Sequence, residues 1–81
     1  MGVYEAANNT LQAHYGIKFN ADTETQSRAF FEKLADEFGA DEVEEAWDIA
    51  CEQYPEPVQA LTKLKGILYN RRRFYSFIEE D

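Results

Sequence analysis

Three consecutive arginines near the end of the chain, Arg71, Arg72 and Arg73, have the clearest chemistry in the sequence. Guanidinium groups neutralise phosphates, and aromatic faces stack on unpaired bases. Two tyrosines lie four residues from an arginine, the spacing that brings side chains together on a helix. We therefore predict a nucleic-acid surface that favours single strands. It would be formed by Lys63, Lys65, Tyr69, Arg71, Arg72, Arg73 and Tyr75.

Charge is distributed unevenly along the chain. Residues 57–78 contain five basic and no acidic residues, although the whole chain has a formal net charge of −8. Nucleic acids and many membrane surfaces repel an acidic chain, so binding to them would need a local basic face. In the alternative interpretation, the arginines pair with carboxylates of the second and third predicted helices, and the neighbouring aromatic residues fill the core.

A second candidate surface is a row of carboxylates in the middle of the chain. Glu44, Asp48 and Glu52 are spaced four residues apart, which aligns them on one strip of a helix. Such a row can imitate a phosphate backbone, and small acidic phage inhibitors, including some anti-CRISPR proteins, have this general character. The row predicts an alternative function, an acidic protein-binding module or inhibitor of a nucleic-acid-processing protein. A simpler interpretation is a solvated helix face.

Catalytic and metal-binding chemistry finds little support. The chain has one cysteine, Cys51, and one histidine, His14, too few ligands for an ordinary structural zinc site. Cys51 would need a nearby base to act as a nucleophile, and we predict instead that it is a small buried apolar residue. No glycine-rich phosphate loop or calcium-binding loop is present. We predict a protein that is not an enzyme and holds no metal or cofactor.

The first half of the chain predicts two helices. The first spans Val3 to about Tyr15, and Gly16 ends it because glycine accepts positive φ. Thr23 and Gln26 have the spacing of a capping box for a second helix, which Gly39 closes. Two apolar residues of the connection are expected in the core: Ile17 and Phe19.

The third predicted helix has the most regular pattern. Asp41 is expected to cap it, with Glu44 three residues on, and Pro55 to end it. Apolar residues recur at helical spacing around Trp47, which is expected to anchor the core. The stripe comprises Val43, Ala46, Trp47, Ala50, Cys51 and Tyr54.

The fourth predicted helix starts at Pro57 and reaches Ile78 if it is unbroken; a bend near Asn70 remains an alternative. Gly66 lies in its middle, where it could let a neighbouring helix approach closely. The apolar face is expected to comprise Val58, Leu61, Leu64, Ile67 or Leu68, and later Phe74, Tyr75 and Ile78. The fold class is therefore all-α, a bundle of four helices in a single domain over residues 1–81.

Four segments of the predicted helices have a characteristic spacing: Tyr15-Gly16, Phe31-x-x-Leu34-x-x-x-Phe38-Gly39, Val43-Glu44-Glu45-Ala46-x-x-x-Ala50 and Leu64-x-x-Ile67-Leu68-Tyr69-Asn70-Arg71. Their layout resembles the C-terminal helical module of DnaD-type primosomal and phage replication proteins. The resemblance spans roughly residues 4–72 and implies DNA binding through the last helix during replication initiation. Lys63 and Arg71 stand where the family's tail motif has aromatic residues.

Location and assembly are indicated only by general features. No apolar run approaches the roughly 18 residues of a transmembrane helix, and no signal peptide is visible. The single cysteine fits a reducing compartment, so we expect a cytoplasmic protein with no membrane partner. A chain this short cannot easily bury twelve aromatic residues, so a homodimer is a third hypothesis. It would form through Phe74, Tyr75, Phe77 and Ile78.

Overall fold

A computed structural model describes the backbone of residues 2–79 and the side chains of residues 2–72. Within this range the chain forms four α-helices and no strand, which confirms the predicted all-α class. A short 3-10 turn precedes the second helix. The elements are α1 (Val3–Tyr15), η1 (Ala21–Thr23), α2 (Glu24–Phe38), α3 (Ala40–Gln53) and α4 (Pro57–Glu79).

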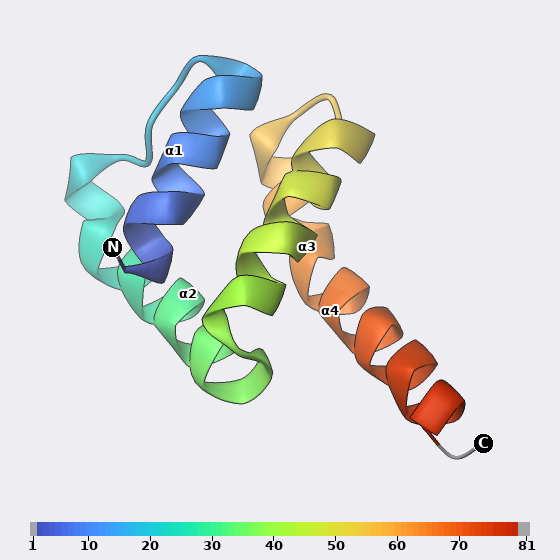
Figure 1. Ribbon diagram of the computed structural model, residues 1–81. Helices are drawn as coiled ribbons and strands as arrows, with labels where there is room; N and C mark the ends of the chain where they lie inside the picture. The colour runs from blue at the N-terminus through green and yellow to red at the C-terminus, as the bar shows by residue number, and fades with distance from the viewer. Residues whose placement is uncertain (1, 80–81) are drawn as a thin grey trace.

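Helix α3 is the centre of the bundle and packs against each of the other three helices (Figure 1). Its predicted apolar stripe is buried except for Tyr54, which is half-buried, and Trp47 is fully enclosed. The indole N–H of Trp47 donates a hydrogen bond to the Ala7 carbonyl of α1 at 2.9 Å. Phe31 of α2 meets the Trp47 ring edge-on, with ring centroids 5.5 Å apart. One aromatic side chain of α3 therefore joins α1 and α2.

The ends of α1 and α2 are partly as predicted. Gly16 adopts a left-handed conformation, φ 72°, and its N–H bonds to the Gln12 carbonyl, which confirms it as the stop of α1. The predicted capping box is wrong, because the Thr23 side chain makes no cap hydrogen bond to α2. Its hydroxyl donates to the Asn20 carbonyl instead, at 3.2 Å. The Thr23 hydroxyl is thus engaged in the 3-10 turn and does not cap the N-terminus of α2.

Gly39 both ends α2 and precedes α3. Its backbone, at φ 95° and ψ 141°, lets the chain reverse direction within one residue. The prediction that Asp41 caps α3 is wrong, since the helix already begins at Ala40. Asp41 lies in the first turn, where its negative charge interacts favourably with the positive end of the helix dipole.

Helix α4 is continuous through Asn70, so the structure shows the unbroken alternative (Figure 1). Its buried stripe differs from the prediction at the start: Ala60 is buried, whereas Val58 is 72% exposed. Val58 is two residues from Ala60 and therefore points away from the side that packs on α3. The expectation that Ile17 enters the core is also wrong, because Ile17 is 46% exposed. Phe19 is half-buried and packs against the core as expected.

Gly66 does not mediate a close helix approach, because a Cβ added there would have no neighbouring atom within 4 Å. An exposed glycine inside a helix costs backbone entropy and contributes no packing. We expect Gly66→Ala to raise the free energy of unfolding by about 0.5–1 kcal/mol. Urea unfolding followed by circular dichroism measures this gain. A loss of stability would contradict the open surroundings seen at Gly66.

None of the helices in the described part of the chain is both long and apolar enough to cross a membrane.

Candidate functional site

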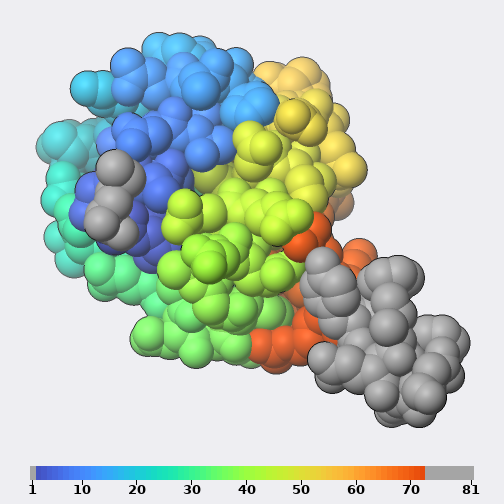
Figure 2. All heavy atoms as spheres, viewed as in Figure 1, coloured from blue at the N-terminus to red at the C-terminus, as the bar shows by residue number. Residues whose placement is uncertain are grey.

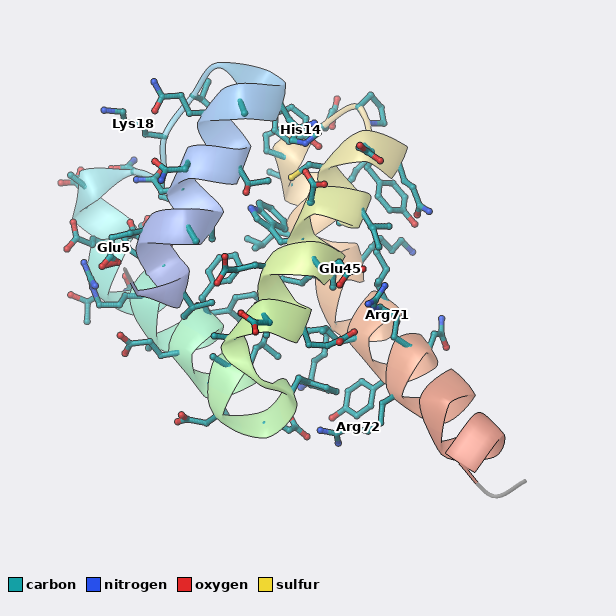
Figure 3. The ribbon with its side chains drawn as sticks, in the orientation of Figure 1. Glu5, His14, Lys18, Glu45, Arg71 and Arg72 are labelled. Carbon is teal, nitrogen blue, oxygen red and sulfur yellow. The ribbon has the colours of Figure 1, made fainter. Side chains whose placement is uncertain are left out.

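Arg71 faces the start of α3, where it meets two carboxylates (Figure 3). Its Nε–H donates to a carboxylate oxygen of Glu42, and its second amino group lies 3.2 Å from Glu45. The Arg71 side chain is 19% exposed. The positive charge is therefore compensated within the chain and largely shielded from solvent. This is the pairing that the structural alternative for the arginines predicted.

Arg72 covers the end of α2. Its guanidinium donates to the Glu37 carbonyl at 2.6 Å and lies over the Phe38 ring, 4.1 Å from the centroid. Tyr69 meets the same ring edge-on at 5.2 Å, and its hydroxyl donates to the Glu37 carboxylate at 3.4 Å. Two residues proposed for nucleic-acid binding thus close the C-terminus of α2, where a cation also complements the helix dipole.

The lysines of the predicted nucleic-acid surface, unlike Arg71 and Arg72, are not held by carboxylates of the described side chains. Lys63 and Lys65 are exposed, and no ion pair reaches either of them within the described side chains. The helix repeat places Lys65, Tyr69 and Arg72 on one strip of α4 and Lys63 on another. The structure therefore does not gather the predicted residues on one face. The side chains of Arg73 and Tyr75 lie outside the described residues.

A continuous carboxylate surface runs along the outer side of α3, and we name it the α3 acidic ridge. At about 100° per residue, its members lie opposite the side of α3 that carries buried Val43 and Ala50. The sequence analysis selected three of these residues and missed that two more lie on the same face. The ridge comprises Asp41, Glu44, Glu45, Asp48 and Glu52.

Most of the ridge is exposed to solvent. Glu44 is half-buried and the other members are exposed. Glu45 pairs with Arg71, and an Asp48 oxygen lies 2.8 Å from His14 Nε2 of α1. Within the described residues, no ion pair neutralises Asp41, Glu44 or Glu52. Helix α3 occupies the front of the molecule in the view of Figure 2, so the ridge is not covered by another helix there.

Cys51 is buried behind this ridge and lacks the features of a nucleophile. Burial, with a smaller contribution from the Asp48 charge, raises the pKa of the thiol to about 11. The thiol is therefore protonated at neutral pH, and thiolate is the reactive form. His14 bonds to Asp48 rather than to Cys51. No cluster of metal-ligating side chains occurs among the residues that the structure describes.

The raised pKa of Cys51 predicts a loss of stability at alkaline pH. The folded state holds the thiol proton more tightly than the unfolded state. The protonated thiol therefore makes its full contribution to the free energy of unfolding below the unfolded pKa of about 8.5. It is lost as pH rises towards 11, and burial raises the pKa values of Tyr4 and Tyr15 in the same sense.

We expect the free energy of unfolding to fall by about 2 kcal/mol or more between pH 8 and pH 11. Urea titrations across this range measure it. Cys51→Ala should flatten the pH dependence. A wild-type chain whose stability is constant up to pH 11 would contradict the burial of these groups.

No protein-family model, curated protein or solved structure matches this chain. The resemblance to DnaD-type modules therefore stays a prediction.

Proposed function

We propose that this chain is a non-enzymatic acidic protein-binding module. Its α3 acidic ridge would dock on a basic surface, such as the nucleic-acid groove of a nucleic-acid-processing protein. The observation that carries the proposal is a contrast in pairing. Arg71 and Arg72 are engaged by the chain's own acceptors, whereas three carboxylates of the ridge have no cationic partner among the described residues.

The geometry of the ridge suits an extended basic partner. Successive carboxylates four residues apart are separated by a rise of about 6 Å along α3. A row of like charges lowers helix stability by about 0.2–0.5 kcal/mol per neighbouring pair. Burial of Val43 and Ala50 on the opposite face holds α3 in place despite this repulsion. The ridge is thus a rigid charged surface, which needs little ordering when it binds.

The test uses an immobilised arginine-rich peptide as a probe of the basic surface. We expect the wild-type chain to bind it with an affinity that falls as salt rises. Reversal of Glu44, Asp48 and Glu52 to lysine should weaken binding about tenfold to hundredfold, since each exposed pair contributes about 0.5–1 kcal/mol.

A matched control distinguishes an effect of the ridge position from an effect of total net charge. The control chain reverses Asp22, Glu32 and Asp36 to lysine, which changes the net charge by the same amount. All three are exposed, and no ion pair holds them within the described residues. If both triple variants weaken binding equally, total charge explains the interaction and the proposal fails.

Binding of single-stranded nucleic acid by α4 is a second candidate function. It is supported by the exposure of Lys63 and Lys65 and by Tyr69, a residue that is 44% exposed. Phosphate contacts by the lysines and stacking on the tyrosine would together form a small site. Because Arg71 and Arg72 are engaged by acceptors of the chain itself, this site would rely mainly on the lysines.

A labelled single strand and a labelled duplex at two salt concentrations test this candidate. If α4 binds nucleic acid, Lys63→Ala combined with Lys65→Ala should reduce affinity and leave helicity unchanged. Replacing the three arginines would be a less specific test, since loss of the Arg71 pairing with Glu42 and Glu45 is also expected to lower stability. Absence of binding at low salt would leave the acidic module as the better proposal.

A further inference from the structure

Two apolar hollows lie on either side of Val58, in the first turn of α4. The first has a volume of about 190 Å³ and is lined by Leu11, Ile17, Phe19, Val58, Leu61 and Lys18, among others. The second, of about 180 Å³, is lined by Tyr54, Val58, Gln59, Thr62 and Lys63. An apolar cavity of about 150 Å³ can hold a benzene ring. Each hollow therefore has room for one aromatic side chain.

The charge around these hollows differs from that of the rest of the chain. One lysine lines each hollow, Lys18 in the first (Figure 3) and Lys63 in the second, and no carboxylate lines either. This occurs in a chain with twice as many acidic as basic residues. A fitting occupant carries large apolar side chains followed by negative charge.

Residues 74–81, which we name the tail, combine large apolar side chains with negative charge. Residues 74–81 read Phe-Tyr-Ser-Phe-Ile-Glu-Glu-Asp, four large apolar residues and three carboxylates. Helix α4 extends past the other helices at its C-terminal end (Figure 1). Its 23 residues span about 33 Å at roughly 1.5 Å per residue, so a chain's own tail cannot return to hollows at the start of the same helix.

We propose that residues 74–81 of one copy occupy the hollows beside Val58 of a second copy. A two-fold axis would let each copy donate its tail to the other and close the dimer. Two aromatic side chains from each tail bury about 150–250 Å² apiece. With the hollow surfaces that they cover, the contact reaches the ~1,000 Å² of a specific interface. The proposal is independent of the α3 acidic ridge.

Sedimentation equilibrium of the full chain over a wide concentration range tests the dimer. We expect a monomer–dimer equilibrium whose Kd rises at least about tenfold in Val58→Glu, because the new charge occupies the wall shared by both hollows. Val58 is exposed, so the substitution should leave the fold intact, and circular dichroism checks that helicity is kept. A chain that is monomeric at every concentration, or a dimer that Val58→Glu leaves unchanged, would overturn the proposal.

A charge swap identifies the tail as the occupant. Lys18→Glu with Lys63→Glu should raise the Kd, and adding Glu79→Lys with Glu80→Lys to the same chain should restore it. The matched control is Lys33→Glu with Lys65→Glu, two exposed lysines outside the hollows. Failure of the tail reversal to rescue the dimer, or an equal effect of the control pair, would show that the tail does not bind there.

Discussion

Replacement of Trp47 by alanine is expected to lower the free energy of unfolding by about 3–5 kcal/mol. The indole is fully buried at the point where α1, α2 and α3 meet, and it packs against Phe31 and Phe19. Its removal leaves a cavity that three helices line. A chain of 81 residues has a total stability of about 4–12 kcal/mol, so the loss is a large part of it.

The hydrogen bond of Trp47 accounts for only part of this effect. The Ala7 carbonyl that accepts it also lies inside α1, where the helix supplies a second donor. Trp47→Phe should therefore cost less than Trp47→Ala. Urea unfolding followed by circular dichroism measures both, with exposed Val58→Ala as the control. A loss below about 1 kcal/mol for Trp47→Ala would mean that the three helices do not depend on this contact.

Replacement of Arg71 by methionine is expected to lower the free energy of unfolding by about 1–3 kcal/mol. The estimate lies between the small value of an exposed ion pair and the larger cost of breaking a buried one, since Arg71 is 19% and Glu42 28% exposed. Without the guanidinium, Glu42 and Glu45 repel each other across one turn of α3. Helix α4 also loses a polar connection to α3.

A double-mutant cycle with Glu42→Gln measures the interaction directly. If the pair stabilises the fold, the double variant should be less destabilised than the sum of the single variants. Lys65→Met is the matched control, because Lys65 is exposed on the same helix and has no ion-pair partner among the described residues. Equal effects of Arg71→Met and Lys65→Met would show that the pairing contributes nothing to stability.

The helices and most of the core were predictable from local pattern. Five of the six residues of the predicted α3 stripe are buried, because a helix with one apolar stripe can bury it in only one orientation. Gly16 and Pro57 marked helix ends for reasons of backbone geometry that act within a single turn. Three of the predictions that failed, at Thr23, Asp41 and Val58, lie at helix ends, where the periodic pattern gives the least information.

The candidate site was less predictable. The sequence identified the arginines and carboxylates but left open whether they face each other or a partner. That question depends on the antiparallel packing of α4 on α3, which brings Arg71 to carboxylates 26 and 29 positions earlier in the chain. The same packing leaves Lys63 and Lys65 exposed.

The sequence by itself determined an all-α chain with an acidic third helix and a basic fourth helix, because charge and helical periodicity are local properties. Only the tertiary structure decided which charges remain available. Ion pairing depends on distances of a few ångströms between side chains that are far apart in the chain. Packing of α4 compensates Arg71 and Arg72 and leaves the α3 acidic ridge exposed, which is why the ridge is the stronger candidate for a binding surface.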